Sequence, residues 1–513
     1  MLNWLQARPW RRHAAALVSA GLVVLAMPKF GLAPLIFIAL TPLTLALEGL
    51  RPRAGFWLGF VYGFGANLGL MYWLGRVLEG YGGLPFWLSG VIVCLLMGIW
   101  ALFPALWAAG LTLAQRSRWP LWLSGGLAWV GLEWVRGWFL TGLPWADLGY
   151  ALTPWPVLIQ MADLGGVGLA SLVVVLTSLG LADLIQGRRR LLTAVVLASL
   201  WTGALGYGVW RLAVVEEKMA DAPQVITRVV QANIDQMDKW DKSFLPQTLA
   251  RYRDLSLAKS PTPPQLIVWT ESAMPFYFLP LRAESEEVIE IVRKSGAWLV
   301  FGSQVYEKEG DQYIFYNRAW LLNPQGEVAG FYDKAHLVPY GEYVPLKRFF
   351  PFLGKITVAV GDFSAGSPGR LMEADFGRLG ALICFESIFP ELTRAHLEAG
   401  ADLIVNISND AWYGASSAPY QSLAMTIWRA VEARRSLARS AQTGISALIG
   451  PDGRMKGSLD LLTTGQVTGP LPILYEKTIY LQGGHYLAPA CLILAGGIIM
   501  AALMRRRRDD SDR

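Results

Sequence analysis

Long apolar stretches separated by short polar loops occupy the first 212 residues of this 513-residue chain. Seven of them reach or approach the ~20 residues that a helix needs to cross a bilayer core, and an eighth lies near the C-terminus. They cover residues 13–28, 31–49, 55–79, 84–114, 120–140, 157–185, 191–212 and 485–504. The pattern predicts a polytopic α-helical membrane domain of about eight transmembrane helices. The first stretch is not expected to be a cleaved signal peptide, because no small-residue cleavage site is evident and another apolar stretch follows at once.

Residues 213–484 follow a different pattern, in which short apolar runs alternate with amphipathic ones. The expected strands are Gln224–Ala232, Gln265–Trp269, Ala297–Val305, Arg318–Leu322, Leu379–Cys384 and Leu403–Ile407, and the expected helices are 241–259, 284–294, 390–399 and 418–437. Turn signals at 323–326 and 450–453 separate further strand candidates. The chain is therefore divided into transmembrane helices 1–7 (1–212), an α/β domain (213–484), transmembrane helix 8 (485–504) and a basic tail (505–513).

Composition and charge support a membrane protein. Hydrophobic residues make up 53% of the chain and charged residues only 16%, and the 22 Trp suit bilayer interfaces. Arginines gather at 8–12, 51–53, 116–118, 188–190 and 505–508, whereas the alternate loops hold almost no Lys or Arg. By the positive-inside rule both termini are cytoplasmic, and 213–484 lies on the far side, the periplasm of a bacterium. The expected location is the bacterial inner membrane. The net charge of +6 comes largely from these clusters and does not indicate nucleic-acid binding.

The fifth apolar stretch carries Glu133 and Arg136, three residues apart and so on one helical face. One interpretation is a structural ion pair within the helix bundle. The other is a site for a lipid headgroup, because charges inside a membrane are costly and often functional.

Cys384 is the first candidate for chemistry. It ends the buried-strand candidate Leu379–Ile383, and strand ends are where α/β proteins expose reactive groups. A free Cys is often simply a small core residue. Glu386 nearby is hard to explain by packing, however, and Cys94 and Cys491 lie in apolar runs, which leaves Cys384 without a disulfide partner. We interpret Cys384 as a nucleophile.

A nucleophilic Cys needs a base, and His is the usual one. His336 is a candidate, whereas His396 is expected on the surface of the helix 390–399. Glu271 directly follows the apolar run Leu266–Thr270, just as Cys384 follows Leu379–Ile383, and Lys334 lies in a polar stretch. A lone Glu or Lys in a loop is usually solvated, but together these three residues form a Glu–Lys–Cys set.

Four segments carry a resemblance to the carbon–nitrogen hydrolase (nitrilase) superfamily: WTESAMP (269–275), YDKAHLVPYGEYVP (332–345), LICFES (382–387) and NISNDAWYG (406–414). The resemblance implies an αββα sandwich with a Glu–Lys–Cys triad. Combined with eight expected spans and with the stretches LEWVRGWFLTGLPW (132–145) and QANIDQMDKW (231–240), the chain resembles the membrane-embedded branch of the superfamily, the apolipoprotein N-acyltransferases.

That resemblance implies a two-step acyl transfer without a metal or cofactor. Cys384 attacks a phospholipid ester to give a thioester, and the N-terminal amine of an S-diacylglyceryl-cysteine on an apolipoprotein then takes the acyl chain. Glu271 is the implied general base and Lys334 the implied oxyanion partner. Glu342 and Glu386 are implied supporting acids. Some relatives carry Tyr where Phe385 stands here, so only the ring or backbone of Phe385 is available to support the site.

The residues expected to contact substrate are Trp240, Trp412, Phe349 and Phe350. The first two match aromatic positions near the family's site. The last two belong to the aromatic and basic stretch Val344–Gly366, which suits either a loop packed on the sandwich or a lid that touches the membrane surface.

Two other functions stay open at this point. A membrane-tethered amidase would use the same triad with water as acceptor, and a transporter or lipid-binding scaffold would carry an inactive hydrolase domain. The complete Glu271–Lys334–Cys384 set disfavours the second. The expected partners are a phospholipid donor and an apolipoprotein acceptor, with the protein a monomer.

Overall fold

The computed structural model describes residues 8–115, 119–236, 238–278, 283–343 and 363–511. The expected lid residues Phe349 and Phe350 lie outside this part of the chain. Contacts divide the chain into two compact units. The helical unit comprises Met1–Arg76, Leu84–Leu212 and Gln482–Arg513, and the sheet unit comprises Val77–Gly83 and Ala213–Leu481.

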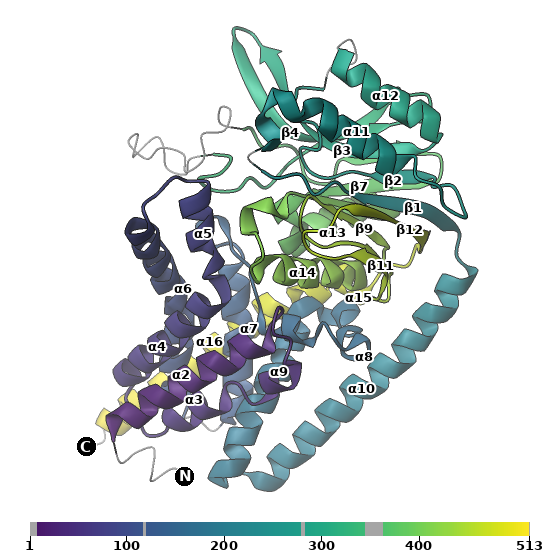
Figure 1. Cartoon of the computed structure of the whole chain (residues 1–513). Coiled ribbons are helices and arrows are strands. Elements are labelled where there is room, and N and C mark those ends of the chain that lie inside the picture. The colour runs from purple at the N-terminus through teal and green to yellow at the C-terminus, as the bar shows by residue number, and fades with distance from the viewer. Residues whose placement is uncertain (1–7, 116–118, 237, 279–282, 344–362, 512–513) are drawn as a thin grey trace. The chain divides into compact units, whose positions relative to one another are not determined.

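Long helices make up the helical unit (Figure 1). They are α2 (Pro9–Ala26), α4 (Pro52–Met71), α6 (Phe86–Ala114), α7 (Leu121–Arg136), α9 (Ala162–Gln186), α10 (Arg190–Asp221) and α16 (Leu487–Ser511). Within the described residues, five helical segments are long and apolar enough to cross a membrane: Pro52–Met71, Phe86–Ala114, Ala162–Gln186, Arg190–Asp221 and Gly484–Met504. The chain therefore has several helices suited to a bilayer, fewer by these measures than the eight expected.

The apolar stretch 31–49 differs from the expected continuous span. It forms the 3-10 helix η1 (Ala33–Phe37) and the short helix α3 (Thr41–Ala46). Pro34 and Pro42 each stand within the first two residues of a helix, where a missing N–H does no harm. Between the two helices, the Leu40 N–H donates to Ser178 Oγ at 2.9 Å and Thr41 Oγ1 donates to the Ser178 carbonyl at 2.8 Å. Apolar composition alone could not reveal this break.

Helices α4 and α6 pack closely because α4 presents a glycine every fourth residue. A Cβ on Gly59 would lie 2.5 Å from Ala108 Cβ, and one on Gly63 would lie 2.8 Å from the Pro104 ring. Small residues at helix interfaces are a common way for membrane helices to gain van der Waals contact.

Glu133 and Arg136 both lie on α7, but each of them contacts a different partner. Glu133 Oε1 accepts hydrogen bonds from Trp129 Nε1 at 2.8 Å and from the Leu148 N–H at 3.0 Å. Arg136 forms an ion pair with Asp147. A direct structural pair between Glu133 and Arg136 is therefore replaced by contacts that tie α7 to the segment after it.

Two six-stranded sheets form the core of the other unit. The first has the order β12-β1-β2-β3-β4-β5 and the second the order β11-β10-β9-β8-β7-β6. The strands of the first are β1 (Gln224–Gln231), β2 (Leu266–Val268), β3 (Trp298–Glu309), β4 (Gln312–Leu322), β5 (Val328–Asp333) and β12 (Gly465–Pro472). Those of the second are β6 (Leu371–Ala374), β7 (Gly377–Ile383), β8 (Leu403–Ser408), β9 (Leu437–Ala441), β10 (Ser446–Ile449) and β11 (Met455–Leu459).

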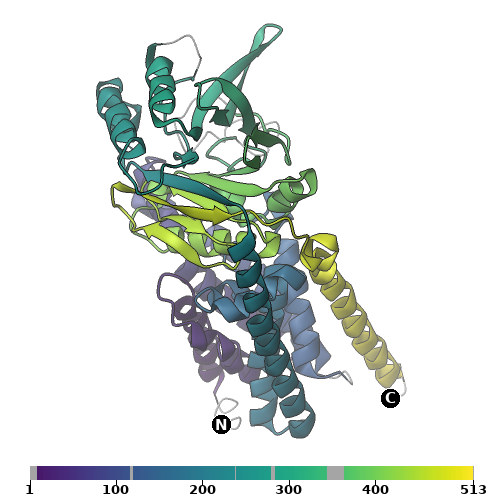
Figure 2. The ribbon, with the colours of Figure 1, turned by 90° about the vertical axis from the view of Figure 1, so that its right-hand side faces the viewer.

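The sheets stack with helices on their outer faces. One buried cluster joins residues of both sheets, among them Val229 and Val268 of the first and Ala381 and Val405 of the second. Helices α11 (Leu245–Ser256) and α12 (Ala283–Ser295) cover the first sheet, and α13 (Pro390–Ala399) and α14 (Ala418–Ala433) cover the second (Figure 1). Figure 2 shows the layers from the side, with the β3–β4 hairpin extending beyond them. The four layers are the expected αββα sandwich.

All six expected strands and all four expected helices of this unit are present, with shifted ends. Strands β3 and β4 are longer than expected, because their exposed halves pair with each other in a hairpin from Leu299–Leu322 out to Glu309–Gln312. The turn signals at 323–326 and 450–453 join β4 to β5 and β10 to β11.

Candidate active site

Three strand ends bring together the side chains that the sequence singled out. Cys384 directly follows β7, Lys334 directly follows β5, and Glu271 lies three residues after β2. Cys384 has φ +54°, a left-handed conformation that is unfavourable for a residue with a side chain. Such strain is typical of functional sites and turns the residue sharply out of the strand.

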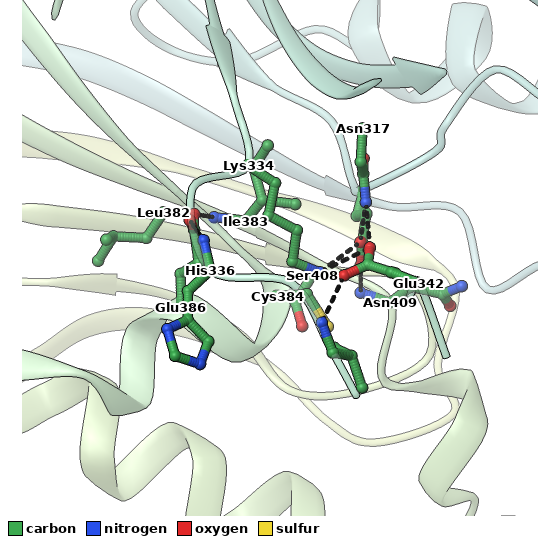
Figure 3. A network of polar contacts seen from close by, with 12 residues as sticks. Asn317, Lys334, His336, Glu342, Leu382, Ile383, Cys384, Glu386, Ser408 and Asn409 are labelled. Atoms are coloured by element: carbon green, nitrogen blue, oxygen red, sulfur yellow. Dashed lines mark hydrogen bonds and ion pairs between the residues drawn. The ribbon is translucent and has the colours of Figure 1, made fainter. Parts of the chain in front are cut away.

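A buried polar network surrounds Lys334, whose side chain is 1% exposed. Its Nζ lies 2.9 Å from Glu342 Oε1 and 3.5 Å from Glu271 Oε1. Asn317, on β4, donates through Nδ2 to both carboxylates, at 2.8 Å to Glu271 Oε1 and 2.9 Å to Glu342 Oε1. Figure 3 shows Lys334 and Glu342 converging beside Cys384.

The remaining oxygens of the two carboxylates are held by backbone groups. The Asn409 N–H donates to Glu271 Oε2 at 3.0 Å, and the Val338 N–H donates to Glu342 Oε2 at 2.8 Å. Each acid is therefore fixed at both oxygens. Glu271 in particular has one orientation, in which its carboxylate is shared by Lys334, Asn317 and Asn409.

The Cys384 thiol is buried and protonated at rest. Burial raises its pKa well above the ordinary value, and the negative charge of Glu271 adds to this. Lys334 and the Asn409 backbone N–H act in the opposite direction. Burial also acts to lower the pKa of Lys334, but the charges of Glu342 and Glu271 outweigh it and the net pKa is raised, so Lys334 stays an ammonium. A protonated thiol beside a carboxylate and an ammonium needs a base at the moment it attacks.

Glu386 ties the Lys334 segment to the Cys384 turn. Its Oε1 accepts from Tyr332 Oη at 2.9 Å, the Ala335 N–H at 2.7 Å and the His336 N–H at 3.0 Å. Its Oε2 accepts from the Ile383 N–H at 2.8 Å. Burial raises the pKa of Glu386 to about 7, against the effect of the donors from Ile383 and His336. Through these contacts the Glu386 side chain contributes to the placement of Lys334 and Cys384.

Phe385 belongs to an aromatic group next to the site. Its ring packs edge-on against Phe389 at 5.1 Å between centroids, and His336 lies 3.9 Å from Phe389 by the same measure.

His396 is not on the surface as expected. It is fully buried, its ring lies 5.1 Å from that of Tyr332, and burial lowers its pKa to about 4.

Trp240 and Trp412 come from two different loops. Trp240 is 44% exposed in the single turn η4 (Asp238–Trp240). Trp412 lies in η7 (Asp410–Tyr413), close in sequence to Asn409. Tyr81 packs edge-on against the Trp412 ring at 4.7 Å between centroids and donates from its hydroxyl to the Ala411 carbonyl at 3.1 Å. Both tryptophans are therefore attached to loops of the sheet unit, and one of them is braced by Tyr81.

Comparison with known proteins gives a family for each part of the chain. Residues 19–180 match the apolipoprotein N-acyltransferase N-terminal domain, and residues 226–475 match the carbon–nitrogen hydrolase domain. Over 503 residues the chain is 40% identical to the apolipoprotein N-acyltransferase of Geobacter metallireducens, which covers 96% of this chain and 95% of that protein. The chain belongs to the apolipoprotein N-acyltransferase family.

A second relative of this family, from Pseudomonas syringae pv. tomato, is 33% identical over 98% of the chain and 99% of its own length. Among solved structures, an amidase from Nesterenkonia sp. matches 50% of the chain and 92% of its own, with 24% identity and a TM-score of 0.37. The family resemblance expected from the four sequence segments is thus confirmed over nearly the whole length of the acyltransferase relatives.

Several residues of the network were not singled out from the sequence of this family member. Asn317 is one polar residue within a long strand, and Tyr332 reads as part of the buried strand β5. Lys239 is 1% exposed, and its Nζ donates to the Glu271 carbonyl at 3.2 Å. The stretches 231–240 and 406–414 did carry the resemblance, but the buried donors within them, Lys239 and the Asn409 N–H, could not be told from solvated loop residues.

Proposed function

We propose that this protein transfers a fatty acyl chain from a membrane phospholipid to the N-terminal amine of the S-diacylglyceryl-cysteine of apolipoproteins. The observation that carries this proposal is the buried network of Glu271, Lys334 and Glu342 beside the strained Cys384, in a chain that matches the acyltransferase family along its length. A covalent intermediate suits two bulky lipid substrates, because they need not be bound together.

In the first step Glu271 takes the thiol proton while Cys384 Sγ attacks the ester carbonyl of the phospholipid. The tetrahedral intermediate places its negative oxygen near Lys334 and a backbone N–H near Phe385. When the intermediate collapses, the carbon–oxygen bond breaks, the proton on Glu271 passes to the leaving alcohol, and a lysophospholipid departs. Preorganised donors of this kind contribute on the order of 3 kcal/mol each to such reactions.

In the second step the free amine of the diacylglyceryl-cysteine attacks the thioester. Glu271 takes a proton from the amine, the carbon–sulfur bond breaks, and the proton returns to Cys384. The products are an amide and the resting thiol. Lys334 stabilises the negative oxygen of both tetrahedral intermediates. Glu342 and Asn317 hold Lys334 and Glu271 in position through their hydrogen bonds.

The membrane arrangement is part of the same proposal. About eight helices cross the inner membrane, both termini face the cytoplasm, and the sheet unit faces the periplasm. The arginine clusters at alternate loops support this orientation. Aromatic residues at Trp240, Trp412 and the stretch containing Phe349 and Phe350 are proposed to contact the acyl chains, and the protein is proposed to act as a monomer.

Intact-protein mass spectrometry tests the chemistry. The purified protein is incubated with phospholipid vesicles, and the wild type is compared with Cys384→Ala. We expect a fatty-acyl adduct in the wild type only, released by hydroxylamine and discharged by a diacylglyceryl peptide with formation of an acylated peptide amine. Free fatty acid in place of acylated peptide would indicate a hydrolase. No adduct and no fatty acid from a folded wild type would contradict any acyl chemistry at Cys384.

A further inference from the structure

Lys239 is a second buried lysine at the site, and the acyl-transfer steps above do not use it. It lies in the turn η4 next to the 44%-exposed Trp240, yet its own side chain is 1% exposed. In the described part of the chain its ammonium donates to the Glu271 carbonyl at 3.2 Å, and no carboxylate forms an ion pair with it there. A buried ammonium held only by a carbonyl is costly, which calls for an explanation.

The segment that carries Lys239 contacts Glu271 from two sides. Through Lys239 it reaches the Glu271 main chain. Through Gln236, whose Oε1 accepts from Asn409 Nδ2 at 2.9 Å, it reaches the residue whose N–H holds Glu271 Oε2. Gln236 and Asn409 are both buried. Gln236 and Lys239 therefore both hold the Glu271 turn in place.

Lys239 brings the charges around the sulfur closer to balance. Glu271 and Glu342 are two carboxylates, and Lys334 alone opposes them. Asp410, which also faces Cys384, is neutralised by Arg439 at 2.8 Å. Tyr413 faces the sulfur as a neutral phenol, because burial raises its pKa. Glu386, on the Lys334 side, is only partly ionised at neutral pH, because burial raises its pKa to about 7.

We propose that Lys239 is a positioning residue that fixes the Glu271 turn and supplies the positive charge that stabilises the Cys384 thiolate once Glu271 has taken its proton. The charge count supports this. Two ammonium groups face two carboxylates at rest, and they face one carboxylate and one thiolate after the proton has moved. Without Lys239 both states carry an extra negative charge in a buried place.

The protonation of Lys239 agrees with this role. Burial lowers its pKa to about 8, while the charges of Glu271 and Cys384 act to raise it. The ammonium is thus the main form at neutral pH. This inference rests on the proposed function, since it concerns the same thiol and the same base.

The test compares Lys239→Gln, which keeps a donor for the Glu271 carbonyl but removes the charge, with Lys239→Arg, which keeps both. Alkylation of Cys384 by iodoacetamide is followed at the peptide level by mass spectrometry, and Cys384 acylation from phospholipid vesicles is followed as a single turnover. Lys308→Gln, the same change at an exposed lysine of β3, is the control.

We expect Lys239→Gln to slow both reactions roughly tenfold, the equivalent of one pKa unit on the thiol, while KM for phospholipid and the melting temperature stay near the wild-type values. Lys239→Arg should recover most of the alkylation rate. Wild-type alkylation in a folded Lys239→Gln would overturn the proposal. If Lys239→Gln does not fold, the rate of Cys384 alkylation in the Lys239→Arg variant decides. A rate near that of the wild type supports the role of the charge, and a tenfold lower rate contradicts it. A wild type that alkylates normally but never acquires an acyl adduct would instead contradict the proposed function.

Discussion

Asn317 shows how much of the site depends on one neutral donor. Its amide nitrogen bridges Glu271 and Glu342, at 2.8 and 2.9 Å, between two acids that would otherwise repel each other. The Asn317 amide can bridge them because it donates a hydrogen bond to each carboxylate and adds no negative charge of its own. Without Asn317, the Lys334 ammonium would be the one group that holds the two side-chain carboxylates in position relative to each other.

Replacing this donor by an acid should disable the base. Asn317→Asp places a third carboxylate against the first two, so that one of the three must bind a proton, and the proton affinity of Glu271 rises. We expect the rate of Cys384 acylation at pH 7 to fall by about 10²-fold or more, as for loss of general-base catalysis. Single-turnover mass spectrometry measures this. Asn323→Asp is a matched control, because the Asn323 amide also donates to a glutamate, Glu327, but on the surface. Equal rates for the two variants would show that Asn317 does not act on the base.

His396 gives a pH dependence with a definite sign. Burial lowers its pKa in the folded protein to about 4, from the ordinary 6.5, so the unfolded chain binds a proton here that the native protein does not. Stability from this group is therefore complete above about pH 6.5 and is lost as the pH falls toward 4, by on the order of 3 kcal/mol in all.

The matching experiment uses His396→Phe, which keeps a ring against Tyr332 but cannot titrate. The melting temperature of the wild type should fall more between pH 7 and pH 5 than that of the variant. An identical fall in both proteins would mean that other groups cause the acid sensitivity. His336, which lies in the partly exposed segment after β5, offers a control in His336→Phe.

At the scale of elements, the turns after the strands carry the precision of the site. Glu271 lies in the turn after β2, where Ser272 has φ +45°. This turn rests on Gly302 of β3: a Cβ there would lie 2.6 Å from the Ser272 nitrogen and 2.8 Å from the Glu271 Cα. Those are backbone atoms, which cannot rotate away. The glycine therefore sets how close the base comes to the sheet.

Gly302→Ala should displace Glu271 while leaving the sandwich folded. Overpacking of this kind costs roughly 1–3 kcal/mol, and a shift of the base of even one ångström is expected to lower the acylation rate about 10²-fold. Acylation kinetics together with thermal unfolding check this. Gly206→Ala, in α10, where no atom lies within 4 Å of the new methyl group, should behave like the wild type. A Gly302→Ala protein as active as the wild type would show that the turn adapts.

The same scale explains what the sequence could predict. The buried strands that hold Leu379–Ile383 and Leu266–Val268 are continuous apolar runs, so the sequence predicts them. It also predicts the reactive residues that follow them, Cys384 and Glu271. Strand β9 was not predicted, because it is short and carries buried polar residues, among them Arg439 and Ser440, whereas β10 was expected only as a strand candidate without bounds before the turn at 450–453. His396 was misplaced although Leu392, Thr393 and Leu397 share its buried face, since its polar type outweighed its position. Asn317 and Lys239 depend on long-range contacts, which no local pattern reveals.

At the scale of the whole molecule, charge at the ends of the apolar stretches predicts the orientation in the membrane. Arginines precede or follow alternate apolar stretches, at 8–12, 51–53, 116–118, 188–190 and 505–508. In the helical unit one of these clusters contributes directly to structure, since Arg188 pairs with Glu48. Arginine-rich loops stay on the cytoplasmic side during insertion, so the loop between α9 and α10 and the β3–β4 hairpin are expected on opposite sides of the membrane.

Single cysteines introduced into a chain in which Cys94, Cys384 and Cys491 are replaced by alanine test this orientation. Arg190→Cys lies at the first residue of α10 and Glu309→Cys at the tip of the hairpin, and both positions are exposed. In intact spheroplasts a membrane-impermeant maleimide should label Glu309→Cys at once and Arg190→Cys only after the membrane is permeabilised. The reverse order of labelling would place the sheet unit, and with it position 384, in the cytoplasm. There it would have no access to lipoproteins displayed on the outer side, so this result would contradict the acceptor as well as the orientation.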